Sequence, residues 1–137
     1  VSLYTEEFYK DIFVKGNIKA KLKVASDCED TCFYIRLSLC KPEGDYGLRD
    51  DINQISNFDA NYIPNDQIEM TFSFDEHTFM VRKGEKLRID ISSSAFPLYV
   101  PHTNQKGLFS TQTTAKTAEN TVILDESYIE MPISSEL

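Results

Sequence analysis

The chain has 137 residues, enough for one compact domain with a substantial buried core. Hydrophobic residues make up 41% of it and charged residues 26%, which is typical of a globular protein and not of a disordered one. Acidic residues outnumber basic residues 22 to 14, and the resulting formal net charge of −8 disfavours nucleic acid and anionic membranes as partners.

The start of the chain and its cysteines give expectations about location. No apolar run approaches the ~20 residues that a membrane span needs, and residues 1–7 lack the basic and apolar regions of a signal peptide. Cys28, Cys32 and Cys40 form an odd set without a CxxC pair, which favours a reducing compartment, and so a cytoplasmic protein. Because the first residue is Val1, we expect a piece cut from a longer polypeptide.

Alternation of apolar and polar residues predicts strands in the first half of the chain. Residues 18–24 alternate apolar side chains with three lysines, which predicts an outward-facing or edge strand. Residues 33–39 repeat the period, and the Pro and Gly residues of 41–47 predict the turn that ends this strand. Weaker strand signals lie at 12–14 and 48–55.

The second half of the chain continues the pattern. Residues 68–74 predict a strand with a bulky buried side, and residues 78–81 and 87–91 flank a short polar connection containing Gly84, which predicts a hairpin. Weaker strand signals lie at 109–114, 121–124 and 128–131. The fold class that we predict is all-β, a two-sheet jelly-roll β-sandwich resembling galactose-binding domains, with eight or nine strands in a single domain spanning residues 1–137.

The sequence contains no recognisable catalytic motif. A hydrolase of the G-x-S-x-G type needs small residues around its serine, and none of the five glycines brackets a serine at that spacing. Asp90, Ser92–Ser94 and His102 form a triad only on paper, because they follow one another at a strand end and the next loop, where hydroxyl groups ordinarily cap backbone groups. We therefore predict no catalytic residue in this chain.

Cofactor and metal sites are not predicted either. Cys28 and Cys32 lead into alternating strand positions, so they are expected to be structural thiols and not zinc ligands. The acidic stretches at 27–30 and 50–51 lack the spacing of a calcium loop, although bound calcium stays an alternative. No phosphate-binding or dinucleotide-binding glycine motif is present.

Aromatic and proline-rich positions suggest binding surfaces. A sugar-binding platform is one alternative, since jelly rolls stack aromatic rings on sugars; its candidate rings are Tyr34, Tyr46, Tyr62, Phe96, Tyr99 and Phe109. The stronger candidate is an interdomain interface in the apolar, proline-stiffened stretch at 92–101. The residues that we assign to this candidate interface are Ser92, Ser93, Ser94, Phe96, Pro97 and Tyr99.

One segment carries a family resemblance. Residues 83–97 read KGEKLRIDISSSAFP, with a Gly, a basic pair, alternating Leu and Arg, a serine run and Phe-Pro in this order. This resembles the C-terminal domain of the X-Pro dipeptidyl-peptidase and cocaine esterase-like serine hydrolases. Residues 30–37 with the 42–44 turn, Gly16, and residues 127–133 are similar to other parts of the family pattern, so that the resemblance spans nearly the whole chain.

The chain departs from the family pattern at three places. Glu85 and Lys86 replace a common His-Arg pair, Ser38 and Leu39 stand where Asp-Val is frequent, and residues 125–126 replace His-Pro. These departures affect the assignment to a subfamily more than the expected fold.

The resemblance implies a non-catalytic jelly-roll domain that follows an α/β-hydrolase domain. The catalytic Ser, Asp and His are then expected upstream of Val1, and the expected partner is that hydrolase domain of the same polypeptide, which this chain stabilises and whose substrate pocket it helps to shape. Dipeptidyl-peptidase and esterase or acylase activities both occur in the family, so the substrate stays open. Two alternatives remain beside this one: a carbohydrate-binding module, and a homo-oligomerisation domain.

Overall fold

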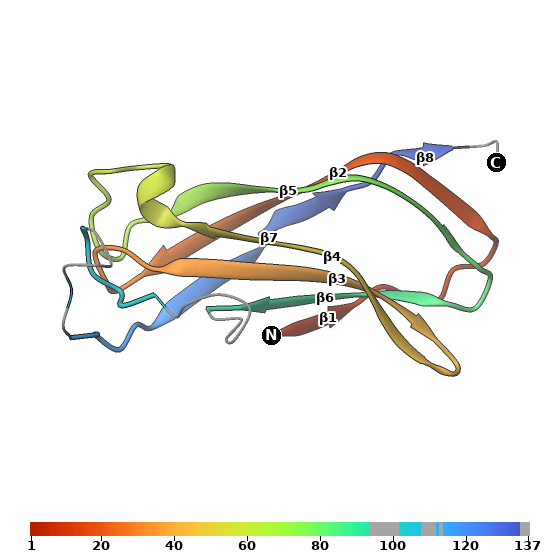
Figure 1. Ribbon diagram of the computed structural model, residues 1–137, viewed down its shortest axis with the longest axis horizontal. Coiled ribbons are helices and arrows are strands. Elements are labelled where there is room, and N and C mark those ends of the chain that lie inside the picture. Colours follow the sequence, from red (N-terminus) through yellow and green to blue (C-terminus); the bar gives the residue numbers. More distant parts are fainter. Residues whose placement is uncertain (94–101, 108–111, 113, 135–137) are drawn as a thin grey trace.

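The computed structural model describes residues 1–93, 102–107, 112 and 114–134, which form two facing antiparallel sheets (Figure 1). The first sheet contains, in spatial order, β1 (Ser2–Tyr4), β6 (Lys86–Ser92), β3 (Cys32–Lys41) and β4 (Gly44–Gln54). The second sheet contains β5 (Ile68–Val81), β2 (Ile12–Ser26) and β7 (Asn120–Glu130), and the short β8 (Ile133–Ser134) also pairs with β2. A single 3₁₀ turn, η1 (Ile55–Asn57), follows β4.

Strand β2 is the centre of the second sheet. Its apolar side chains Ile18, Leu22 and Val24 are at most 3% exposed, whereas the alternating lysines face away from the core, as the period-2 pattern predicts. The expectation of an edge position was wrong, because β2 pairs with β5 along one side and with β7 and β8 along the other. The lysine side chains therefore mark an outer face and not an edge.

The predicted hairpin around Gly84 was also wrong in its pairing. Residues 78–81 are the end of β5, which pairs with β2, whereas residues 87–91 belong to β6, which pairs with β1 and β3 in the other sheet. The turn thus carries the chain across the sandwich instead of closing a hairpin. Gly84 has a φ of +88°, a conformation that side chains disfavour, which explains the glycine.

The other predictions can now be placed. Strand β3 contains the segment predicted at 33–39, and β5 contains those predicted at 68–74 and 78–81. Strand β4 begins at Gly44, inside the turn predicted at 41–47, and ends one residue before the end of the segment predicted at 48–55, because Ile55 begins η1. The two signals at 121–124 and 128–131 are parts of one strand, β7. Gln112 and Thr114 do not lie in a strand, and the rest of residues 109–113 falls outside the described residues. Strand β1 was not predicted. With eight strands in two sheets among the described residues, the predicted all-β jelly-roll sandwich is confirmed.

The core fills the space between the two sheets. Its largest fully buried side chains come from both of them, and they include Phe33, Ile35, Leu37, Ile18, Met70 and Phe74. The exposed fraction of each is at most 2%, so the sandwich is held mainly by apolar burial. Within the described part of the chain, no helix is long and apolar enough to cross a membrane.

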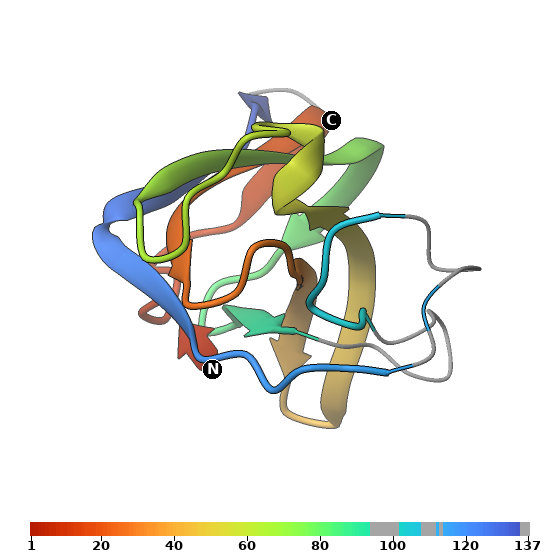
Figure 2. The same ribbon diagram turned by 90° about the vertical axis from the view of Figure 1, so that its left-hand side faces the viewer.

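Loops gather at one end of the sandwich, which faces the viewer in Figure 2. They include the connection between β2 and β3, the η1 turn, residues 102–107 and the segment that leads into β7. Several hydrogen bonds join them, for example between the Glu119 amide and Asp27 Oδ1 and between the Lys106 amide and Glu29 Oε1. Several residues that the sequence analysis considered as site candidates lie at this end, among them Cys28, Ser92 and His102.

Candidate functional site

The first two residues of the predicted interface lie at this loop end. Ser92 is the last residue of β6, opposite Tyr34 of β3, and Ser93 follows it. Both serines are exposed, and the Ser93 carbonyl accepts a hydrogen bond from the Cys32 thiol at 3.1 Å. The remaining members of the predicted interface, Ser94, Phe96, Pro97 and Tyr99, lie outside the described residues.

The catalytic triad considered in the sequence, Asp90 with Ser92–Ser94 and His102, does not form among the described residues. Asp90 accepts hydrogen bonds from the Ser2 hydroxyl and from Arg88 Nε, on the outer face of the first sheet. His102 is engaged with Asp30 instead, at 3.5 Å from Nε2 to Oδ2, and its Nδ1 accepts a hydrogen bond from the Asn104 amide. With both ring nitrogens engaged in this way, His102 has no described serine to activate.

His102 belongs to a buried polar cluster that joins four parts of the chain. Asp30 is 3% exposed, and its Oδ1 accepts hydrogen bonds from the Thr31 and Ser56 amides. The Thr31 hydroxyl, fully buried, donates to Asn104 Oδ1 at 2.6 Å and accepts from Asn120 Nδ2 at 3.2 Å. These bonds tie the start of β3 to η1, to residues 102–107 and to the start of β7. The cluster is a structural clamp, because most of its polar groups bond to one another; among the buried side-chain atoms of the described residues, only Asn120 Oδ1 lacks a partner.

Electrostatics at Asp30 favour its charged form. Burial acts to raise the pKa of its carboxyl group. Hydrogen bonds from His102 and Ser56 and the electrostatic attraction of His102 lower this pKa by more than burial raises it, so the net shift is downward. Asp30 is therefore a carboxylate at neutral pH. A buried carboxylate with this many donors is typical of a structural anchor as much as of a reactive site.

The cysteines show no sign of a metal site. All three are free, and burial raises the pKa of the Cys28, Cys32 and Cys40 thiols, which keeps them protonated and unreactive at neutral pH. In the described part of the chain, no group of three or more His, Cys, Asp or Glu side chains could hold a metal ion.

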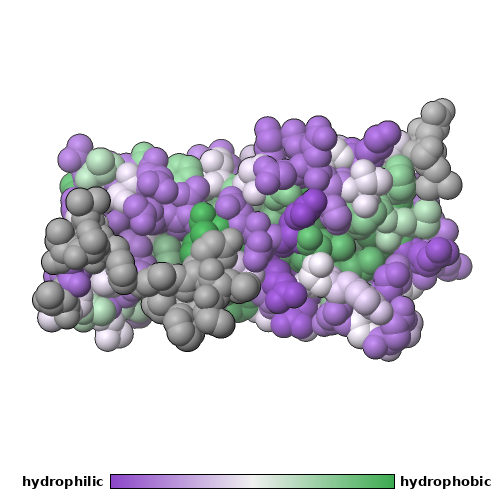
Figure 3. Space-filling model, in the orientation of Figure 1, coloured by the Kyte–Doolittle hydropathy of each residue, from purple (hydrophilic) through white to green (hydrophobic). Residues whose placement is uncertain are grey.

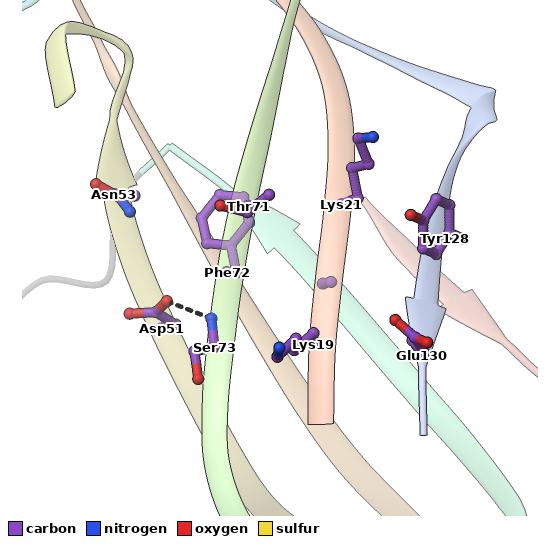
Figure 4. Close-up of a pocket in the computed structure, with 10 residues that line it drawn as sticks. Lys19, Lys21, Asp51, Asn53, Thr71, Phe72, Ser73, Tyr128 and Glu130 are labelled. Carbon is purple, nitrogen blue, oxygen red and sulfur yellow. Dashed lines mark hydrogen bonds between the residues drawn. The ribbon is translucent and has the colours of Figure 1, made fainter. Parts of the chain in front are cut away.

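A polar groove crosses the outer face of the second sheet (Figure 4). It encloses about 460 Å³ between Tyr128 and Glu130 of β7 on one side and Asp51 and Asn53 of β4 on the other, with the lysines of β2 between them. Lys21 is paired with Glu69 at 2.9 Å, and Asp51 Oδ2 accepts the Ser73 amide at 3.0 Å. Charges of both signs alternate here, as on an ordinary solvated sheet face.

A second, apolar opening lies between the edge strands β1 and β7, and we call it the β1/β7 opening. It encloses about 270 Å³. Its lining residues are apolar or aromatic except for one serine, and they are Leu3, Leu22, Ile35, Ile89, Ile91, Leu124, Ser127, Tyr128 and Ile129. The opposite side of the sandwich, where β4 lies, faces the viewer in Figure 3 and is mostly hydrophilic, with hydrophobic surface in a hollow between the strands.

Of the three described aromatic residues proposed for a sugar platform, two are buried and only Tyr46 is exposed. Tyr34 and Tyr62 are only 7% and 3% exposed, and their hydroxyl groups bond to Asp50 Oδ2 and to backbone groups of Ser26 and Asp66. Tyr46 is half exposed, but the Lys41 ammonium group lies 5.6 Å from its ring centre. Phe96, Tyr99 and Phe109 are outside the described residues.

Sequence reasoning missed both the polar cluster and the β1/β7 opening. The cluster joins residues 30, 56, 102 and 120, and no local pattern connects positions so far apart. The opening did leave a signal, because residues 122–124 are three apolar residues in a row, which cannot all face one side of a regular strand. In the structure, the register between β2 and β7 shifts just there.

Comparison with known proteins begins with a family model. The model for the X-Pro dipeptidyl-peptidase C-terminal non-catalytic domain matches residues 2–130, which is nearly the whole chain. No curated protein matches the sequence significantly.

Solved structures share the fold at low sequence identity. An aminopeptidase from a marine sediment archaeon, Thaumarchaeota archaeon, superposes with a TM-score of 0.89 at 18% identity, over 98% of this chain and 26% of that one. An alpha-amino acid ester hydrolase gives 0.83 at 18% identity, over 98% and 25%. A CocE/NonD family hydrolase from Staphylococcus aureus gives 0.70 at 14% identity, over 98% and 30%. This chain thus spans between a quarter and a third of those chains.

Proposed function

This chain belongs to the family of X-Pro dipeptidyl-peptidase C-terminal non-catalytic domains, and on that premise we propose that it packs on an α/β-hydrolase domain of the same polypeptide, stabilises it and helps to shape its substrate pocket. The observation that carries the proposal is the family match over residues 2–130. The three similar structures support it, since each is a hydrolase or aminopeptidase three to four times as long as the part matched by this chain.

The proposal assigns no catalytic residue to this chain. Among the described residues, the ring nitrogens of His102 are bonded to Asp30 and to the Asn104 amide, and to no serine hydroxyl. The Ser2 hydroxyl donates to Asp90, but that carboxylate is also bonded to Arg88, on the outer face of the first sheet, and not to a histidine. The nucleophile, the base and the acid would all belong to the hydrolase domain, which precedes this domain because the family domain is C-terminal. Ser92 to Tyr99 remain our candidate for part of the interdomain contact.

A cytoplasmic location is part of the proposal. The three free, protonated thiols support it, since disulfides form and persist mainly in oxidising compartments. The proposal assigns no substrate class, because this fold alone does not determine whether the parent enzyme acts on peptides or on esters.

Two measurements test the proposal. Reading the coding sequence upstream of Val1 should reveal a nucleophile elbow of the G-x-S-x-G type, and an unrelated domain there would contradict the proposal. The 137-residue chain alone should cleave neither an Xaa-Pro chromogenic dipeptide nor a nitrophenyl ester, whereas the parent polypeptide should cleave at least one of them. Activity of the chain alone that disappears on mutating one of its own serines would contradict it.

A further inference from the structure

We infer that the β1/β7 opening is the part of this domain that the hydrolase domain covers, by inserting apolar side chains between the two edge strands. The inference rests on the proposed function, and it specifies which surface of this domain contacts the hydrolase domain. Ser92 and Ser93, the described residues of the interface predicted at 92–101, lie at the loop end, whereas the β1/β7 opening runs along the side of the sandwich.

Apolar exposure is the first argument. Leu124 is 47% exposed and Tyr128 is 55% exposed at the mouth of the opening, while Leu22 and Ile35, at most 3% exposed, are core residues that line it. The opening therefore leads from exposed apolar side chains at the surface to the edge of the core. Apolar side chains so placed are stabilised when another surface removes them from water.

The polar groups argue against a small-molecule ligand. Ser127 is the single polar residue in the lining, and its hydroxyl group is already used: it accepts the Lys23 amide at 3.0 Å and donates to the Ile123 carbonyl at 2.7 Å. Besides Ser127, only the Tyr128 hydroxyl provides a polar side-chain group among the lining residues, and Tyr128 is 55% exposed at the mouth. The volume of about 270 Å³ also lies below the ~300–1,000 Å³ of ordinary ligand pockets. An apolar side chain of a protein fits this chemistry better.

Edge strands make the second argument. Among the described strands, β1 and β7 are the outermost strands of their sheets on this side, and each has an edge that pairs with no further described strand. β1 is only three residues long, and β7 is interrupted by the register shift at residues 124–127. Natural proteins cover or blunt such edges, and here the covering element would come from outside the domain.

The occupant that we assign is the hydrolase domain of the same polypeptide. Ile91 lines the opening and Ser92 follows it directly, so the opening is continuous with the start of the interface predicted from the sequence. The similar solved chains are three to four times longer than the matched region, which provides the covering domain. A small apolar patch is sufficient between linked domains, because linkage raises their effective concentration to the millimolar range.

Other faces are less suitable. The outer face of the second sheet carries Lys19, Lys21 and Lys23 among acidic side chains, and covering it would remove many charges from water. The outer face of the first sheet is likewise occupied by the ion pairs of Arg88 with Asp45 and Asp90.

Hydroxyl-radical footprinting of the full parent polypeptide tests the inference without any substitution. Tyr128 and Tyr9 are 55% and 79% exposed in this domain, and Tyr9 does not line the opening. We expect Tyr128 to be oxidised severalfold more slowly than Tyr9, well beyond the ratio of these exposed fractions. Oxidation in proportion to the exposed fractions would overturn the inference.

A pair of variants adds a second readout in the same polypeptide. Leu124→Asp places a charge at the mouth of the opening, whereas Ile133→Asp places one at a residue of β8 that is 61% exposed and outside the opening. We expect Leu124→Asp to lower the melting temperature of the hydrolase domain and to restore fast oxidation of Tyr128, and Ile133→Asp to do neither. Equal effects of the two variants would count against the inference.

The outcomes separate the two proposals. A parent polypeptide without a hydrolase domain overturns the proposed function and this inference with it. A hydrolase-bearing parent in which Tyr128 is oxidised in proportion to its exposure overturns the inference alone. Protection of Tyr128 that depends on protein concentration, together with a dimer in sedimentation, overturns it in favour of a second copy of the chain.

Discussion

The two long sides of the sandwich are closed by different chemistry. On the β4/β5 side, Asp51 lies opposite Ile35 on the inner face of its sheet, and its carboxylate accepts the Ser73 amide of β5, so that a polar bond joins the sheets. On the β1/β7 side, the inner residues Leu3, Leu124 and Ile129 are apolar, and the lining of the opening offers no such bond. The β4/β5 side is therefore closed in part by a polar bond within the domain, whereas the β1/β7 side has apolar surface that another surface could bury.

This difference shows how one β-sandwich can be stable on its own and still bind another protein surface on one side. Inward-pointing polar groups on an edge strand discourage pairing with another molecule, which protects the β4/β5 side. An apolar seam does the opposite, because water is a poor partner for it. Polar groups between the sheets therefore indicate a side that stays in water, and apolar groups there indicate a side that another protein surface covers.

The largest expected effect concerns apolar burial on the two sides. Phe74 of β5 is 1% exposed, and Phe74→Ala should lower the free energy of unfolding by about 3–5 kcal/mol, since it leaves a cavity in the core. Ile129 of β7 is only partly buried, and Ile129→Ala should cost about 1–2 kcal/mol. Urea unfolding of the two variants measures both. Equal losses would mean that the β1/β7 side is as well packed as the core.

A smaller effect is expected at the hydroxyl group that bridges the register shift of β7. Ser127→Ala leaves the Lys23 amide and the Ile123 carbonyl without their partner, and should cost about 1–2 kcal/mol in urea unfolding. Ser127→Thr keeps a hydroxyl group and serves as the control. Asp51→Ala, which removes an exposed bond on the other side, should cost less than about 1 kcal/mol. The reverse order would contradict our comparison of the two sides.

The polar cluster at the loop end predicts a pH dependence. The pKa of Asp30 in the folded protein is lowered from its ordinary value, so its stabilisation is complete above the unfolded pKa of about 3.9 and is lost as the pH falls through the folded value. The melting temperature should therefore fall as the pH drops from about 5 to below 4. Asp30→Asn should be less stable at pH 7 and should show a flatter profile. An unchanged profile would show that His102 and Ser56 do not favour the charged carboxylate.

The smallest effect is expected on the outer face of the second sheet. Lys21 and Glu69 form an ion pair at 2.9 Å, and it lowers the pKa of Glu69, but both side chains are exposed to solvent. Exposed pairs contribute little because water and salt screen them. Glu69→Gln should leave the urea midpoint unchanged within error at physiological salt. A clear loss would mean that the polar groove contributes to the fold.

Alternation in the sequence was sufficient to predict most of the long strands and their buried faces. It placed Ile18, Leu22 and Phe74 inside and the lysines of β2 outside, because a period of two is a local property. It did not predict which strands are neighbours, and so it gave a hairpin at Gly84 and an edge position for β2, both wrong. Pairing depends on contacts between distant segments, which one local window does not contain.

The candidate site shows the same limit. The serine run and the family pattern singled out residues 92–101, and Ser92 does border the β1/β7 opening through Ile91. Asp30 looked like part of a solvated acidic loop, but it is buried because residues 56 and 102, far along the chain, supply its donors. A three-residue strand such as β1 is too short to show a period.

The central position of β2 has a consequence for biosynthesis. Its 15 residues are made early, but their partner strands β5 and β7 begin only at Ile68 and Asn120. At about 5–20 residues per second, a ribosome needs roughly 5–20 s to make the roughly 100 residues between the end of β2 and the end of β7. During that interval the apolar face of β2 emerges without its sheet, so this segment is where we expect chaperones to bind the nascent chain.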